Sequence, residues 1–167
     1  MHLKSAKNIG IATGTLMIVA TLILFYIFKL PDTGITKYTS YGIYIAGILL
    51  ALFLYKNTSN TEKTFKAFFS EGFKVFVIAV LFMAIFTFIF YKINFNILVA
   101  NITEIETFNS KDPNKTAAEV LENSKKLKSI ALPMTVATTT FLNLVLGAIV
   151  TALGAGFLSQ PMLNENK

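Results

Sequence analysis

Few side chains in this sequence could carry out chemistry, and those few form no recognised catalytic pattern. Cysteine is absent and His2 is the single histidine, so disulfides, thiolate metal sites and a histidine-based triad within one chain are excluded. Every basic residue is a lysine, which removes the bidentate clamps that arginine offers to phosphate or carboxylate. We therefore expect no catalytic residue, no metal site and no cofactor, and a protein that is not an enzyme.

The remaining polar candidates are Glu71, Lys74 and Asn143. Glu71 and Lys74 stand one helical turn apart before the third apolar stretch, where they could bind a lipid headgroup or a partner. A weak ion pair, worth a few tenths of a kcal/mol, is the commoner role of such a pair. Asn143 and the threonines before it could line a hydrophilic path. A structural role is favoured, in which the hydroxyls bond their own helix and Asn143 bonds a neighbouring one.

The carboxylates of the second half also lack suitable partners. Glu104 and Glu106 are two residues apart, so on a helix they point to different faces. Asp112, Glu119 and Glu122 have no histidine or cysteine with which to hold a metal or activate a nucleophile. We interpret them as parts of a solvated helix face.

Four long stretches without any charged side chain must position these residues: Ile9–Phe28, 38–55, 75–91 and 130–158. A bilayer core of roughly 30 Å needs about 17 to 25 helical residues. Hydrophobic residues make up 54% of the 167 residues and charged ones only 14%, against about 25% in soluble domains. The sequence predicts an all-α polytopic membrane protein, a bundle of four transmembrane helices forming a single membrane domain over 1–167.

The segments between the stretches are also predicted to be helical. Residues 61–74 carry phenylalanines at helical spacing and predict an amphipathic helix that lies in the membrane interface. Residues 92–129 predict a helical hairpin outside the membrane. Its second helix would cover 114–128, with Asp112 as N-cap and Pro113 in the first position. The fourth transmembrane helix would then begin near Ile130 with Pro133 in its first turn.

Small residues at four-residue spacing indicate where the helices approach closely, because helix association in lipid depends on close packing. The first, second and fourth helices are expected to pack through them. The third helix, rich in phenylalanine, is expected to face lipid or a second subunit. The packing candidates are Gly10, Gly14, Gly47, Ala51, Gly147, Thr151 and Ala155.

The charge distribution suggests an orientation and a class of partner. The net charge is +6, and lysines lie near the ends of the stretches, which suits anionic headgroups and makes nucleic-acid binding improbable. The side that holds both termini has lysines close to the membrane, so we expect both termini in the cytoplasm. The first stretch is expected to be retained rather than cleaved as a signal peptide. All six tyrosines lie near the ends of the stretches, as interfacial tyrosines do.

The second half resembles a family of bacterial inner-membrane proteins known only as a domain of unknown function. The resemblance implies the four-span layout with the long loop third, and it implies no activity. Members often have proline where this chain has Phe95. The residues that carry the resemblance are Phe69–Lys74, Ile89–Asn94, Lys125–Leu127, Pro133, Leu146–Val150 and Leu153.

Three functions remain open for an integral inner-membrane protein of this kind. The first is a non-enzymatic protein that binds a membrane protein partner or supports assembly, beside its contact with the lipid bilayer. The second is a small transporter or channel subunit that works as a homo-oligomer, with Asn143 facing a symmetry axis. The third is a membrane enzyme acting on lipid through carboxylates at the membrane surface, with Glu71, Glu104 and Asp112 as the residues to test.

Overall fold

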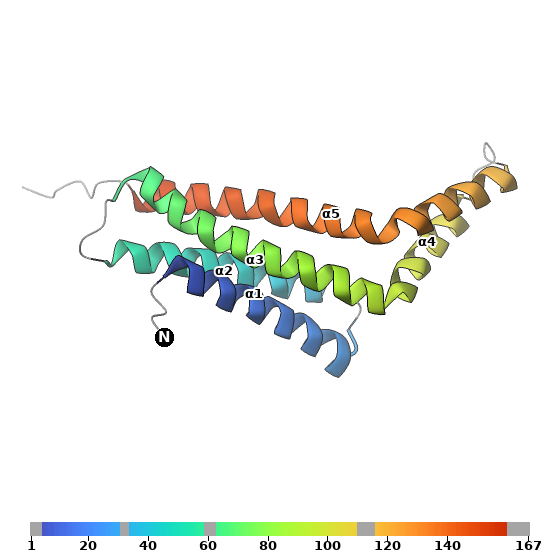
Figure 1. Cartoon of the computed structure of the whole chain (residues 1–167), viewed down its shortest axis with the longest axis horizontal. Coiled ribbons are helices and arrows are strands. Elements are labelled where there is room, and N and C mark those ends of the chain that lie inside the picture. Colours follow the sequence, from blue (N-terminus) through green and yellow to red (C-terminus); the bar gives the residue numbers. More distant parts are fainter. Residues whose placement is uncertain (1–4, 31–33, 59–62, 110–115, 160–167) are drawn as a thin grey trace, which may run out of the picture. The chain divides into compact units, whose positions relative to one another are not determined.

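The computed structural model describes residues 5–30, 34–58, 63–109 and 116–159, which are almost entirely helical. Four helices in these ranges are long and apolar enough to cross a membrane, and each predicted span falls on one of them. The prediction of an all-helical, multi-span membrane protein is therefore confirmed. In chain order (Figure 1) the elements are α1 (Ala6–Leu22), a π-helical turn η1 (Ile23–Ile27), α2 (Ile35–Lys56), α3 (Phe65–Ile93), α4 (Phe95–Asn109) and α5 (Ala117–Leu158).

The chain divides into two compact units, which are described separately. Unit 1 comprises Met1–Met83 and Phe141–Lys167, and unit 2 comprises Ala84–Thr140. Within the described residues, unit 1 thus holds α1, η1, α2, the longer part of α3 and the end of α5. Unit 2 holds the end of α3, α4 and the beginning of α5. The single membrane domain over 1–167 stays a prediction.

The first two helices of unit 1 pack against each other. A short connection between them reverses the direction of the chain. Helix α1 continues into η1, and Lys29 then takes a left-handed backbone conformation with φ 53°. The Leu30 amide donates to the Leu24 carbonyl oxygen at 3.0 Å and closes the turn. Helix α2 follows from Ile35, so α1 and α2 form the antiparallel pair expected from the short loop.

The core of unit 1 contains large buried side chains from α1, α2 and α3. Its fully buried large side chains are Met17, Tyr44, Ile48, Leu52, Phe68 and Val75. Tyr44 was expected near the membrane interface with the other tyrosines, and that expectation is wrong, since its side chain is completely buried. The reason is its position on the face of α2 that packs inward, one turn before Ile48.

Helix α3 corrects two expectations about the third transmembrane segment. It runs without interruption from Phe65 to Ile93, so the predicted separate interfacial helix over 61–74 is the first part of α3, and residues 61 and 62 lie outside the described ranges. Its phenylalanines do not all face outward either. Phe68 and Phe76 are buried, whereas Phe65, Phe73 and Phe88 are exposed. Apolar residues recur around the helix, so one side packs in the protein while the other remains for lipid.

Helix α5 begins at Ala117 with a reciprocal cap formed by Thr116 and Glu119. The Glu119 carboxylate accepts from the Thr116 amide and hydroxyl, both at 2.8 Å, and the Glu119 amide donates to the Thr116 hydroxyl at 3.3 Å. This is the capping box of a helix N-terminus. Helix α5 thus begins at Ala117, and the expected first residue Asn114 and the predicted cap residues Asp112 and Pro113 lie outside the described residues.

The helices predicted over 114–128 and 130–158 form one continuous helix, α5, with Pro133 inside it. The expectation that Pro133 stands in the first turn of a separate helix is wrong. In unit 2 the buried side chains Leu98 and Ile102 of α4 pack with Ala131 of α5. Leu127 and Leu132 complete this small core together with Tyr91. Apolar contacts on both sides of residue 130 keep the chain helical there. The placement of α4 and the first part of α5 outside a membrane stays a prediction.

Candidate functional site

Gly10 and Gly14 of α1 lie against α3. A Cβ added at Gly10 would come within 2.9 Å of the Val75 carbonyl oxygen, and one added at Gly14 within 2.9 Å of the Phe82 Cβ. Distances below 3 Å leave no room for a side chain, so both glycines bring the helix backbones into direct contact. The predicted small residues of the first helix thus meet the third helix, which the sequence interpretation had placed outside the small-residue contacts.

Gly47 and Ala51 occupy the inner face of α2. A Cβ at Gly47 would overlap the Thr13 side chain of α1, and Ala51 is buried. Thr13 is buried as well, so the threonine fills the space that the glycine leaves. Farther along the same pair of helices, the Thr21 and Ser40 hydroxyls lie 3.0 Å apart, and Thr21 donates to the Met17 carbonyl oxygen at 2.9 Å. The Thr21 and Ser40 hydroxyls therefore both have partners inside the protein.

Gly147, Thr151 and Ala155 form the inner face of α5 in unit 1. A Cβ at Gly147 would overlap the Tyr44 hydroxyl and lie 2.7 Å from the Phe76 ring. Thr151 and Ala155 are completely buried. The Thr151 side chain sits over Gly72 of α3, where an added Cβ would lie 2.5 Å from it. The row consequently seats α5 against both α2 and α3.

A polar contact lies at the centre of unit 1, between Tyr44 and Asn143. The Tyr44 hydroxyl donates to the backbone carbonyl oxygen of Asn143 at 3.0 Å. The Asn143 side chain is buried, and its Oδ1 has no hydrogen-bond partner within the described part of the chain; the same holds for the Thr151 hydroxyl. Buried polar atoms are normally hydrogen-bonded, so these two acceptors are the places in unit 1 where a polar group could still bind.

The burial of Asn143 bears on the proposal that it faces a symmetry axis between copies. Only 3% of the residue is exposed, and it lies beside Tyr44 within a single unit 1. Asn143 therefore points into one chain's own bundle. Of the threonines considered with it, Thr138 is exposed, and Thr135, Thr139 and Thr140 are half-buried.

Glu71 and Lys74 form an ion pair on the first part of α3. The Lys74 ammonium donates to the Glu71 carboxylate at 2.6 Å, and both side chains reach solvent or headgroups. Since the two residues are neighbours on one helix, their attraction contributes little to stability. Glu104 is exposed on α4, and Asp112 lies outside the described residues, so no convergence of these three carboxylates is observed in the described ranges.

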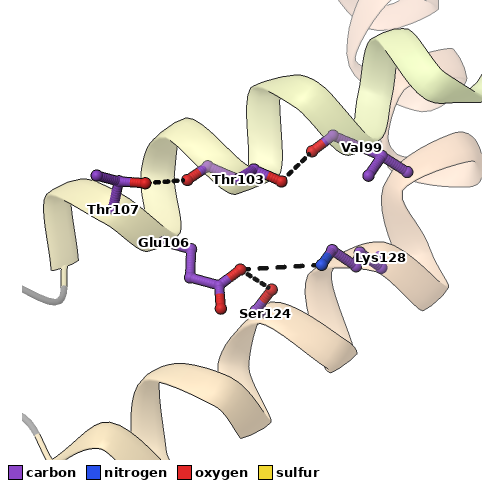
Figure 2. Close-up of polar contacts among 6 residues, drawn as sticks. All are labelled: Val99, Thr103, Glu106, Thr107, Ser124 and Lys128. Atoms are coloured by element: carbon purple, nitrogen blue, oxygen red, sulfur yellow. Dashed lines mark hydrogen bonds and ion pairs between the residues drawn. The ribbon is translucent and has the colours of Figure 1, made fainter.

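Unit 2 contains a polar contact that the sequence interpretation did not single out (Figure 2). The Ser124 hydroxyl of α5 donates to the Glu106 carboxylate of α4 at 2.8 Å, and the Lys128 ammonium lies 3.8 Å from the same oxygen. Ser124 is buried, and the Glu106 side chain is 29% exposed. The signal was present in the sequence, because Ser124 lies on the apolar side of its helix and Lys128 follows it by one turn.

Neither unit offers a metal site in its described residues, since no group of three or more histidine, cysteine, aspartate or glutamate side chains lies close enough together. The polar atoms described above can donate or accept hydrogen bonds and balance charge. Their arrangement suits the positioning of helices and, at Asn143 and Thr151, the acceptance of one further hydrogen bond each.

Comparison with known proteins places the chain in a wider group. The family model described as "Protein of unknown function (DUF4199)" matches residues 8–160, which include α2, α3, α4, α5 and nearly all of α1. No curated protein and no solved structure matches the chain.

Proposed function

Since the chain belongs to the family of proteins of unknown function (DUF4199) and that description assigns no activity, we propose its function from its own structure. We propose that it is a non-enzymatic integral membrane protein that binds a second protein through unit 2. We further propose the bacterial inner membrane as its location, with both termini in the cytoplasm, on the basis of the lysines near the ends of the spans.

The observation that carries this proposal is the ordered helical pair of α4 and the first part of α5. A segment that served only to connect two spans would not need a core of its own, yet Leu98, Ile102 and Ala131 are buried together. The Glu106–Ser124 hydrogen bond holds the same pair. If α4 and the first part of α5 lie outside the spans, as we propose, their packed pair offers a rigid surface of the kind that protein recognition favours.

An apolar side chain on this helical pair marks the proposed contact surface. Leu121 is 50% exposed in a part of α5 that also carries Glu122, Lys125 and Lys126. Its neighbour one turn away, Ser124, is buried against α4. An exposed leucine with charged residues around it resembles the centre and rim of an interface.

A photo-crosslinking amino acid at position 121 tests the proposal in native membranes. Asn123 provides the matched control, because it is exposed on the same helix and points about 160° away from Leu121. We expect the probe at 121 to yield one defined adduct with a second protein, identified by mass spectrometry, and the probe at 123 to yield much less. In addition, Leu121→Lys should prevent copurification of that protein. Equal labelling from both positions would contradict the proposal.

A small transport subunit is the second candidate, and the unpartnered Asn143 Oδ1 and Thr151 hydroxyl favour it. These atoms could give a polar solute or water a place to bind inside unit 1. Flux measured in liposomes that contain the purified protein would test this candidate. We expect Asn143→Leu to abolish such flux, whereas Thr138→Val, at an exposed position, should leave it unchanged. Absence of flux from the unmodified protein would remove the candidate.

A further inference from the structure

An open apolar groove runs between α2 and α5 in unit 1. Its volume is about 460 Å³, within the roughly 300–1,000 Å³ of ligand pockets. No polar surface contributes to its lining, which consists of Leu49, Leu50, Phe53, Gly154, Phe157 and Leu158. An occupant of this groove has to be hydrocarbon, because a polar group would lose its hydrogen bonds there.

Gly154 creates the depth of the groove. A Cβ added at this position would lie 2.6 Å from the Leu52 Cδ1 and 3.4 Å from the Leu49 Cδ2. Any larger residue would therefore project into the space beside Leu49. The groove is open to the outside because Leu50, Phe53 and Phe157 remain more than half exposed around it.

The groove lies near one end of the membrane spans. Leu49 and Phe53 belong to the uncharged part of α2, and the helix ends at Lys56. Seven residues at 1.5 Å each place Leu49 about 10 Å below Lys56 along the helix axis. The groove is thus at the depth of the first part of an acyl chain, and Lys56 is at the depth of its headgroup.

Lys56 stands on the same side of α2 as the groove. It follows Leu49 by seven residues, which is about two full helical turns. The end of α2 would normally repel an anion, because its last carbonyl groups carry partial negative charge. Here the Lys63 ammonium donates to the carbonyl oxygens of Tyr55, Lys56 and Thr58 at 3.0, 2.6 and 2.8 Å, so this negative charge is compensated.

Among the described residues at this end of unit 1, lysines outnumber acidic residues. Glu71 is the one acidic residue described there, and it is already paired with Lys74. A phosphate near Lys56 would therefore meet an excess of positive charge with little competition from carboxylates. The lysines described at this end are Lys7, Lys56, Lys63, Lys66 and Lys74.

We propose that this groove binds one anionic phospholipid, with an acyl chain between α2 and α5 and the phosphate at Lys56. The apolar lining of the groove favours the acyl chain. The lysines at this end of unit 1 favour a negatively charged headgroup. This site is distinct from the proposed protein-binding surface of unit 2 and does not depend on it.

The proposal can be tested by native mass spectrometry of the full-length protein in mild detergent. Delipidated protein would be titrated with phosphatidylglycerol or with phosphatidylcholine that carries the same acyl chains. We expect a first phosphatidylglycerol to bind about fivefold more tightly than phosphatidylcholine, as one lysine near an anionic headgroup implies. Lys56→Gln should remove this preference. Lys37→Gln, the same change at the opposite end of α2, should preserve it.

Variants of the groove lining separate the contribution of the acyl chain to lipid binding from that of the headgroup. Gly154→Leu fills the groove and should weaken binding of both lipids several-fold. Phe53→Ala, which removes an exposed wall without crowding the helices, should weaken both as well and covers the case in which Gly154→Leu does not fold. Equal losses from Lys56→Gln and Lys37→Gln would overturn the proposal, as would binding of glycerol phosphate with the affinity of the intact lipid.

Discussion

The helices of unit 1 meet at glycines and threonines, whereas those of unit 2 meet at aliphatic side chains and a carboxylate. In unit 1, Gly10 brings the backbones of α1 and α3 into contact, Gly47 makes room for the Thr13 side chain, and the Thr21 hydroxyl bonds its own helix. In unit 2, Leu98 packs on Ala131, and Glu106 binds Ser124 and approaches Lys128. Burial of leucine drives association in water but not in lipid, where close packing does. The contrast fits the prediction that α4 meets water, while its partner Ala131 lies at the start of the fourth predicted span.

The largest expected effect concerns the glycine contacts of unit 1. Gly10→Ala places a Cβ 2.9 Å from the Val75 carbonyl oxygen, a backbone atom that cannot rotate away. We expect a loss of about 1–3 kcal/mol in the free energy of unfolding, as overpacking costs elsewhere. Gly42→Ala is the matched control, because nothing lies within 4 Å of a Cβ there. It should stabilise the protein by up to about 1 kcal/mol.

Unfolding in mixed detergent micelles would measure both alanine variants. Changes of the same sign in the two would show that close helix contact is not what holds unit 1 together, and the contrast with unit 2 would then lose its basis.

A smaller effect is expected from the hydrogen bond that joins α2 to α5 in unit 1. Tyr44→Phe removes the donor to the Asn143 carbonyl oxygen, and interhelical hydrogen bonds in membranes are worth about 0.6 kcal/mol on average. The same unfolding assay should show a loss of about this size. Tyr38→Phe, at a tyrosine that is 74% exposed, should have no measurable effect. A loss of several kcal/mol would mean that polar contacts rather than packing dominate unit 1.

In unit 2 we expect the attraction between Glu106 and Lys128 to contribute to stability and to weaken at high salt. Glu106→Gln can keep a hydrogen bond with Ser124 but loses the attraction of Lys128, a change of a few tenths of a kcal/mol. Amide hydrogen exchange in α4 should rise slightly, and high salt should diminish the difference from the unmodified protein. Glu104→Gln, on an exposed position of α4, serves as the control. Exchange that rises equally in both variants would contradict a specific role of Glu106.

The smallest effect concerns the cap of α5. Hydrogen bonds from the Thr116 amide and hydroxyl lower the pKa of Glu119, since they favour its charged form. A lowered pKa means that the cap stabilises the folded state above the ordinary glutamate pKa and is lost as the pH falls through the folded value. NMR titration of the Glu119 carboxyl group should show this. Thr116→Ala should return its pKa toward the ordinary value, and an unchanged titration would refute the capping geometry.

The sequence was sufficient for the number and position of the spanning helices, because uncharged stretches of this length have few other solutions. It was not sufficient to predict the residues at which these helices begin and end. The predicted boundaries after Lys74 and before Ile130 are absent, since α3 and α5 continue through them. Contacts made only in the folded protein decide this: Gly72 lies under Thr151, and Leu127 and Ala131, on the two sides of residue 130, belong to one core or pack against it.

The candidate site was predictable in its residue types but not in its partners. A small residue shows that a helix approaches closely there without showing which helix does so, and Gly10 was thus expected against the wrong neighbours. Tyr44 was missed because an inward tyrosine near the end of a span looks like an interfacial one. The Thr116–Glu119 cap, in contrast, has the residue spacing of a capping box, which predicts it from the sequence. Asp112 and Pro113 offered a second, competing start for the same helix.

The hydrogen bond from Tyr44 to Asn143 joins residues 99 positions apart, and this distance has a consequence for biogenesis. During synthesis α1 and α2 reach the membrane well before α5 has left the ribosome. Until then the Tyr44 hydroxyl and the space over Gly72 lack the helix that covers them. We expect the nascent protein to be held by an insertion factor in this interval, and a chain truncated before α5 to be degraded by membrane proteases.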